Sequence, residues 1–274
     1  MIALNCLAAL AVLALHARRP HEQQGGTSAV MRQPQKITKA LVLLLTMNSG
    51  CADAISFLAL GQVLTAAMTG NTVFLGLALV GAKHFMPQVY LVAILSFMAG
   101  AAWAAFVVRG KRHVTGLNET VLTALWYEEA MLLIFAILAF AMPDLPADLF
   151  VFLLAFSMGV QGATARRLGV NGVPTTVITS TSTGLMEYLV WHPIEVREQR
   201  NQRGQSKPST DFRPSIWLWA SDIVLYAAGA AASGFLELRV GLRAIVLPLI
   251  IIGVVALWSR TALRHEKRIE HPDQ

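Results

Sequence analysis

Apolar residues are grouped along the chain in blocks of about the length of a membrane-spanning helix. Such a helix needs about 20 consecutive apolar residues to cross the hydrocarbon core of a bilayer. Eight stretches approach this length, at residues 40–60, 62–82, 88–108, 120–142, 147–168, 173–191, 215–236 and 242–259. Their continuous runs of Leu, Ala, Val and Ile lack the alternation of membrane β-strands. The pattern predicts an all-α, polytopic helical membrane protein.

Two of these blocks contain polar and helix-breaking residues where the bilayer interior would lie. The block at 62–82 is interrupted at residues 68–71, and the block at 173–191 by a proline and a run of threonines and serines. Irregular backbone is tolerated at membrane depth only where protein or water surrounds it. We therefore expect six full spans and two broken or re-entrant segments, with a complete but unwound span at 62–82 as the alternative.

Composition supports the membrane assignment and removes one class of partner. The chain is 55% hydrophobic and 14% charged, with a formal net charge of +6, whereas soluble domains carry about 25% charged residues. The basic residues form short clusters between apolar blocks, so nucleic acid is not an expected partner. The expected surroundings are the lipid bilayer.

The distribution of Lys and Arg distinguishes two topologies. If all eight blocks span the membrane and the N-terminus is cytoplasmic, 15 of the 22 basic residues lie inside. If the two broken blocks return to the side they entered from, 19 lie inside and only Lys83, Arg239 and Arg243 lie outside. Because cytoplasmic loops carry an excess of Lys and Arg, we predict the six-span topology with cytoplasmic N- and C-termini.

The chain is expected to contain a single membrane domain with polar ends. The bounds are 1–37 for an N-terminal extension and basic leader, 38–260 for the membrane domain with halves 40–142 and 147–259, 192–214 for a cytoplasmic loop, and 261–274 for a cytoplasmic tail. We expect residues 1–30 to be an extension of the reading frame or a dispensable segment. Their apolar part is too short to span a membrane, and no basic residue precedes it as in a signal peptide.

Two patterns occur once in each half of the chain. Residues 50–54 (GCADA) are echoed by residues 159–163 (GVQGA), and residues 97–106 by residues 226–235. Three full spans in each half, an odd number, would insert the second half upside down relative to the first. Inverted repeats with a broken helix at the same place in each half indicate a midplane binding site in secondary transporters.

Two sequence signatures carry a family resemblance. They are residues 50–58 (GCADAISFL) followed by Gly61 and 68–73 (MTGNTV), and residues 158–161 (MGVQ) followed by Arg166 and 175–179 (TTVIT). Together they resemble the YoaK-like family of uncharacterised bacterial membrane proteins, over about residues 38–260. One departure is Ser180, where the family usually has a glycine. The resemblance implies a bacterial cytoplasmic (inner) membrane protein and supplies no established activity.

Asp53 is an ionisable residue near the middle of the first span. Such residues are costly in a bilayer and are usually partnered or functional. One interpretation is an ion pair with Arg166 that locks the fold, and the other is proton or cation coupling or contact with a substrate. Arg166 and Gln161 near the end of the block at 147–168 are further candidates, with Arg166 also able to meet an anionic ligand.

The broken segments supply further candidate binding residues. These are Thr69, Gly70 and Asn71 in the first segment, and Thr175, Thr176 and Thr179 in the second. They offer hydroxyls, an amide and a glycine that can take a positive φ, and freed backbone groups beside them could bind a cation or a small polar solute. The alternative is that the small residues only allow close helix packing and the hydroxyls bond to the preceding turn.

The remaining acidic residues are ranked by their place in the blocks. We expect Glu128 to reach the membrane interface and Glu129 to face the bundle, which makes Glu129 a secondary candidate. Glu187 and Asp222 are expected to be solvated near segment ends. Neither a nucleophile motif nor a metal-ligand cluster is recognised, so no enzyme activity, metal or cofactor is expected.

These features favour a small secondary transporter or channel for a small polar solute or ion, with its polar site between inverted repeats. The alternative is a non-transporting membrane scaffold or stress-associated protein whose polar residues only hold helices together.

Overall fold

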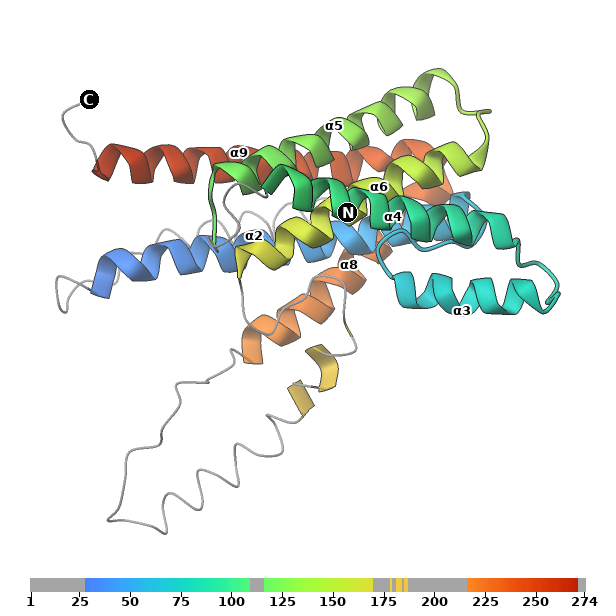
Figure 1. The fold of residues 1–274 in the computed structure, drawn as a ribbon, viewed down its shortest axis with the longest axis horizontal. Helices are drawn as coiled ribbons and strands as arrows, with labels where there is room; N and C mark the ends of the chain where they lie inside the picture. Colours follow the sequence, from blue (N-terminus) through green and yellow to red (C-terminus); the bar gives the residue numbers. More distant parts are fainter. Residues whose placement is uncertain are drawn as a thin grey trace, which may run out of the picture.

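The computed structural model describes residues 28–108, 116–169, 178, 181–183, 185–186 and 216–270. In chain order its main elements are α2 (Ser28–Ala59), α3 (Met68–Leu79), α4 (Pro87–Val108), α5 (Glu119–Ala141), α6 (Ala147–Leu168), α8 (Ile216–Val240), the 3-10 helix η2 (Gly241–Ile245) and α9 (Val246–Glu270) (Figure 1). This part of the chain is helical without strands, as predicted. Three candidates, Thr175, Thr176 and Thr179, and the loop 192–214 lie outside the described residues.

Five helical stretches are long and apolar enough to cross a membrane. Four of them correspond to α2, α4, α5 and α6, and the fifth, Trp217–His265, is 49 residues long. This last stretch contains two helices, α8 and α9, which η2 separates. Gly241 opens η2 with a φ of 63°, a conformation that glycine adopts readily. The chain reverses its direction at this point (Figure 1).

The short helix α3 occupies the second predicted block. Its 12 residues extend about 18 Å, which is less than the ~30 Å hydrocarbon core. Regular structure is broken before α3, at residues 60–67, where Gly61 and Gln62 have φ values of 90° and 59°. The expectation that Gly70 provides the positive φ is therefore wrong, because Gly70 lies in the first turn of α3. In Figure 1 residues 60–67 run back from the end of α2, and α3 leads outward again to the start of α4.

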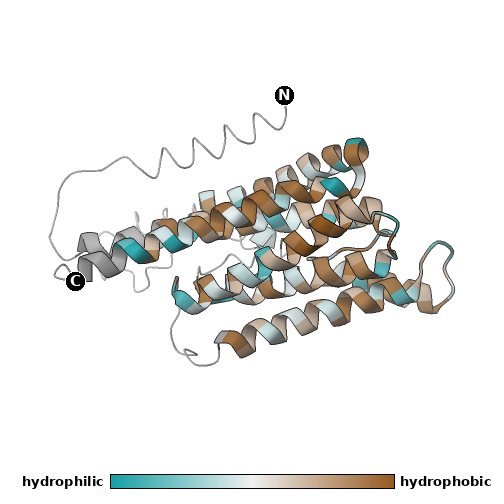
Figure 2. Cartoon of the chain, turned by 90° about the horizontal axis from the view of Figure 1, so that it is seen from above, coloured by the Kyte–Doolittle hydropathy of each residue, from teal (hydrophilic) through white to brown (hydrophobic). Residues whose placement is uncertain are grey.

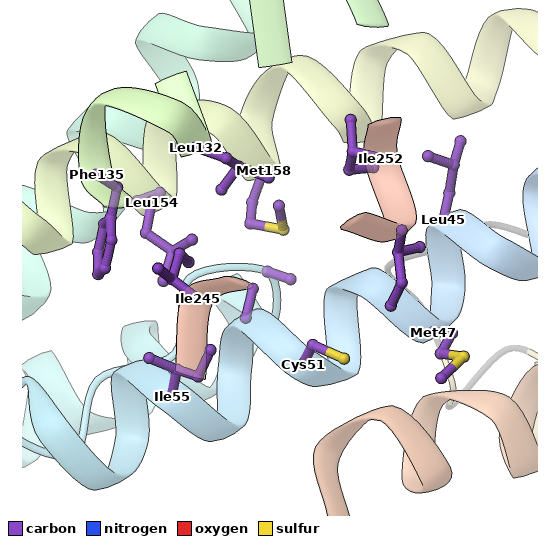
Figure 3. Packing of buried hydrophobic residues seen from close by; sticks show 14 of the residues in the cluster. Leu45, Met47, Cys51, Ile55, Leu132, Phe135, Leu154, Met158, Ile245 and Ile252 are labelled. Carbon is purple, nitrogen blue, oxygen red and sulfur yellow. The ribbon is translucent and has the colours of Figure 1, made fainter. Parts of the chain in front are cut away.

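Helix α2 is the central helix of the bundle. In its most apolar window 83% of the residues are buried, compared with 33% for α4. It contacts α6, α8, α9 and η2. Figure 3 shows Leu45, Cys51 and Ile55 of α2 beside apolar side chains from α5, α6, η2 and α9. Side chains of α2 are therefore surrounded by protein rather than by lipid.

Large apolar side chains cover much of the outer surface of the bundle. Trp217, Val80 and Leu238 are 83%, 80% and 74% exposed. Figure 2 shows hydrophobic residues, in brown, along most of the length of the helices. Exposed apolar surface on this scale marks a surface that contacts other apolar material. Lipid chains provide such surroundings for a multi-pass membrane protein.

Two glycines bring the backbones of α2 and α8 into direct contact. A Cβ atom on Gly50 would lie 2.1 Å from the carbonyl oxygen of Tyr226, and one on Gly229 would lie 2.2 Å from that of Met47. Any side chain at either position would overlap the neighbouring helix. Small residues permit this close approach in membrane bundles.

The crossing of α4 and α6 has the same construction. A Cβ atom on Gly159 would lie 2.1 Å from the carbonyl oxygen of Phe97, and one on Gly100 would lie 2.0 Å from that of Phe156. The first pattern of each half thus supplies Gly50 or Gly159, and the second supplies the glycine that faces it in the opposite half.

Candidate functional site

Asp53 is buried in α2, with 3% of its surface exposed, and its carboxylate joins three parts of the chain. Oδ1 accepts hydrogen bonds from the backbone N–H groups of Thr65 and Ala66, at 2.7 and 2.6 Å. Oδ2 accepts a hydrogen bond of 2.5 Å from the hydroxyl of Tyr226 in α8. Asp53 therefore holds the irregular segment 60–67 against α2 and fastens both to α8.

The interpretation that Asp53 pairs with Arg166 is wrong. Arg166 lies in the last turn of α6 and its side chain is exposed. Both oxygens of Asp53 accept hydrogen bonds from Thr65, Ala66 and Tyr226 instead. Backbone N–H groups and a hydroxyl satisfy the carboxylate where a cation was expected.

Asn71 is fully buried and is bound to the irregular segment. Its Oδ1 accepts a hydrogen bond of 2.9 Å from the N–H of Leu64, and its Nδ2 donates to the carbonyl of the same residue. The side chain thus takes both backbone groups of Leu64, as a neighbouring strand would. Thr69 is exposed and Gly70 half-buried at the start of α3. The structure does not gather these three candidates around one point.

Gln161 of α6 points into the interior of the bundle, toward α2. Its Nε2 donates to the carbonyl of Leu45 at 3.0 Å and to Oγ of Ser49 at 2.7 Å. Its Oε1 accepts a hydrogen bond of 2.6 Å from Nδ2 of Asn48. All of these side-chain atoms are buried.

The expectation that Glu128 reaches the membrane interface is wrong. Glu128 has no exposed surface, and its Oε1 accepts a hydrogen bond of 3.3 Å from Nδ2 of Asn48. Glu129 is half-buried and turns toward α9, where its Oε1 would lie 3.3 Å from a Cβ atom on Gly253. Helix α5 is apolar on all sides, so its sequence does not specify which of two adjacent residues faces inward.

Asn48, Ser49, Glu128 and Gln161 form what we call the central polar cluster. It lies where α2, α5 and α6 meet, and each member has at most 1% of its surface exposed. Only Gln161 was a candidate from the sequence. The missed signal is in α2, where Asn48 lies inside a largely apolar span although a buried amide is costly unless it is hydrogen-bonded.

A second buried carboxylate lies between α2 and α8. Asp222 has no exposed surface and accepts a hydrogen bond of 2.5 Å from Oγ1 of Thr46. The buried Thr181 also hydrogen-bonds this carboxylate. The expectation that Asp222 is solvated is therefore wrong. Thr181 links the described part of the second broken segment to the bundle.

Within the ranges that the structure describes, no three His, Cys, Asp or Glu side chains come together in a group that could hold a metal ion. The central polar cluster itself offers two amides, a hydroxyl and one carboxyl group as hydrogen-bonding groups.

Comparison with known proteins gives two matches. A family model described as "Protein of unknown function (DUF1275)" matches residues 41–258. The chain is also 33% identical over 229 residues to the UPF0700 transmembrane protein YoaK of Bacillus subtilis (strain 168), and the match covers 83% of this chain and 96% of that protein. No solved structure matches.

Proposed function

We propose that this membrane protein, which belongs to the DUF1275 family, is a small secondary transporter or channel for a small polar solute or ion. The family's description as a protein of unknown function leaves the activity to be argued from geometry. The family membership of the chain agrees with the resemblance indicated by its two sequence signatures, which contain Asp53 and Gln161.

The observation that carries the proposal is the central polar cluster. Four polar side chains, one of them a carboxyl group, lie fully inside a bundle whose exterior is apolar. A carboxylate at the centre of a membrane helix costs about 2.5–3.5 kcal/mol, and such residues usually mark an ion or substrate pathway. A bundle held together by packing alone has no need of this arrangement, because small residues such as Gly50 already supply close contact.

A repeated architecture supports the transporter class. In our proposal α2, α3, α4 and α5 form one repeat, and α6, the second broken segment, α8 and α9 form the other, inverted one. The matching glycine contacts support it: Gly50 meets Tyr226 as Gly159 meets Phe97. The α2–α8 crossing then corresponds to the α6–α4 crossing, and the central polar cluster lies where the two repeats meet, as in secondary transporters.

Six membrane crossings complete the proposed architecture. A continuous helix of the 49 residues in Trp217–His265 would extend about 73 Å, more than twice the hydrocarbon core, so α8 and α9 count as two crossings. Because α3 is too short to cross, residues 60–79 form a re-entrant segment that Asp53 and Asn71 hold. With this count the positive-inside rule gives cytoplasmic termini in the bacterial inner membrane.

A non-transporting scaffold is the second candidate function. It is favoured by Asp53 and Asn71, whose polar atoms are taken up by Tyr226 and by the backbone of residues 64–66. In this role the polar side chains would only shape the bundle. Water access to the central polar cluster distinguishes the two functions.

Thiol labelling in intact cells tests water access. In a chain carrying Cys6→Ser and Cys51→Ala, a cysteine is introduced by Ser49→Cys in the central polar cluster. Ser96→Cys in α4 is the matched control, because Ser96 is also buried but lies outside the cluster. Transport predicts that a charged, membrane-impermeant methanethiosulfonate modifies the first variant and not the second. If both folded variants are inert, the scaffold function is favoured.

A further inference from the structure

We propose that Glu128 and Asn48 form a proton-binding site at the centre of the bundle, in which the Glu128 carboxyl group takes up and releases the proton. The inference rests on the proposed transport function, in which this proton is the coupling ion. The site depends on the orientation of two amide side chains, those of Gln161 and Asn48.

A backbone carbonyl fixes this orientation. The carbonyl oxygen of Leu45 can only accept a hydrogen bond, so the Gln161 atom 3.0 Å from it must be the donor Nε2. Oε1 of Gln161 therefore faces Asn48, and the Asn48 atom that meets it at 2.6 Å must be the donor Nδ2. The same Nδ2 lies 3.3 Å from Oε1 of Glu128. Oδ1 of Asn48 is left for another partner.

Two buried acceptor atoms in the Asn48 and Glu128 side chains receive no hydrogen bond from the described residues. They are Oδ1 of Asn48 and Oε2 of Glu128. Buried polar atoms without partners are rare and call for an explanation. A proton on the Glu128 carboxyl group converts Oε2 from an acceptor into an O–H donor, and Asn48, which already meets Glu128 through Nδ2, keeps Oδ1 as an available acceptor. The proton is the only particle gained, and it returns to water when it is released.

The other acidic groups near Glu128 have different surroundings. On its own helix, Glu129 is half-buried and turns toward Gly253 of α9, and its Oε2 also lacks a partner among the described residues. On α2, the carboxylate of Asp53 is occupied by N–H groups and a hydroxyl. On α8, Asp222 accepts hydrogen bonds from Thr46 and Thr181, and its Oδ2 has no partner among the described residues. Among the fully buried carboxyl groups of the described helices, which are Asp53, Glu128 and Asp222, Glu128 thus accepts the fewest hydrogen bonds.

Basic groups do not neutralise Glu128 either, within the parts of the packed helices that are described. Arg166 of α6 is exposed at the helix end, and Arg243 of η2 lies over the ring of Phe140, 5.3 Å from its centroid. The basic residues of α9 with described side chains, Arg260, Arg264 and His265, are exposed. Helix α4 has no acidic or basic residue, and its one tyrosine, Tyr90, packs against Phe74 and Phe85. A buried carboxylate without a counter-charge is unfavourable, and a bound proton removes its charge.

Infrared spectroscopy of the purified full chain in lipid nanodiscs tests the site. A protonated carboxyl group gives a C=O stretching band that a carboxylate lacks. We expect a band that fades as the pH is raised, that is lost in Glu128→Gln, and that is retained in Glu129→Gln, the same substitution at the neighbouring residue. Labelling glutamate with ¹³C in the wild-type chain should shift the band, which assigns it to a glutamate without any variant. The pair of variants then identifies Glu128.

Three results would overturn the proposal. They are the absence of a glutamate band, a band that does not respond to pH, and a Glu128 carboxylate signal that responds to Na⁺ instead of pH. The outcome is separable from that of thiol labelling. If Ser49→Cys is inert but the Glu128 band titrates, the proton site stands and the transport function fails. If Ser49→Cys is modified and no such band exists, transport stands without this proton site.

Discussion

The hydroxyl of Tyr226 donates a hydrogen bond of 2.5 Å to one oxygen of Asp53, and the other oxygen accepts the N–H groups of Thr65 and Ala66. The two residues lie on α2 and α8, the helices whose backbones touch at Gly50. The Tyr226–Asp53 bond therefore connects segment 60–67 to the crossing of α2 and α8. Substitution of Asp53 or Tyr226 should destabilise both the segment and the crossing.

Tyr226→Phe should lower the free energy of unfolding by about 1–3 kcal/mol, because Oδ2 of Asp53 would remain buried without its donor. Thermal unfolding of purified protein in detergent, followed by circular dichroism, measures the change. Tyr127→Phe is the matched control, since Tyr127 is 41% exposed and its loss should have little effect. Equal unfolding temperatures for the two variants would contradict the importance of the bond.

Two substitutions at Asp53 should differ strongly. Asp53→Asn keeps an oxygen for the N–H groups of Thr65 and Ala66, and the Tyr226 hydroxyl can accept from the new amide, so we expect a loss of about 1 kcal/mol. Asp53→Leu leaves two buried N–H groups and a hydroxyl without an acceptor and should cost at least about 3 kcal/mol. The yield of monodisperse protein on size exclusion reports the difference. Similar yields of the two variants would show that the carboxylate does not hold the segment.

The glycine crossings should be equally intolerant of a methyl group. Gly50→Ala and Gly159→Ala each place a Cβ atom 2.1 Å from a carbonyl oxygen, and overpacking of this kind costs about 1–3 kcal/mol or more. Gly76→Ala in α3 is the control, because an added Cβ atom there meets nothing within 4 Å. Unfolding temperatures measured side by side give the comparison. Tolerance of alanine at only one crossing would argue against equivalent roles.

Asn71→Ala should loosen the irregular segment, because both backbone groups of Leu64 lose their partner. We expect faster proteolysis of purified protein between α2 and α3, together with a loss of about 1–3 kcal/mol in stability. Thr72→Ala is the control, since Thr72 is exposed and its hydroxyl bonds only to the preceding turn at Met68. Unchanged cleavage in Asn71→Ala would mean that other contacts hold the segment.

The helices were predictable from sequence because lipid imposes a length and a composition on them. The predicted blocks at 88–108 and 147–168 match α4 (Pro87–Val108) and α6 (Ala147–Leu168) to within a residue. The break after α2 was placed too late. Its positive φ values fall on Gly61 and Gln62, and glutamine gives no sequence signal for that conformation. The polar residues at 68–71 marked the beginning of α3.

The candidate site was predictable only where a residue is unusual for its depth. Asp53 and Gln161 stand out in apolar helices, and both are buried and hydrogen-bonded. The choice between Glu128 and Glu129 requires the rotation of α5 about its axis, which an apolar face on every side leaves unspecified. Tyr226 was missed as a partner of Asp53, because their contact depends on the way α8 packs, 173 residues further along the chain.

The two glycine crossings differ in the polar bond beside them. At Gly50 and Gly159 the backbones of two helices are in direct contact, and at the second crossing side chains such as Ala104 and Val160 also pack together. In the proposed repeat, Gly162 corresponds to Asp53, and Phe97 corresponds to Tyr226. The first of each pair lies near the α4–α6 crossing and the second near the α2–α8 crossing. The hydrogen bond between Tyr226 and Asp53 joins the helices of the α2–α8 crossing. Glycine and phenylalanine have no side-chain groups that could form such a bond at the α4–α6 crossing. Movement between α2 and α8 would therefore require the Asp53–Tyr226 bond to open, whereas movement between α4 and α6 would break no corresponding bond.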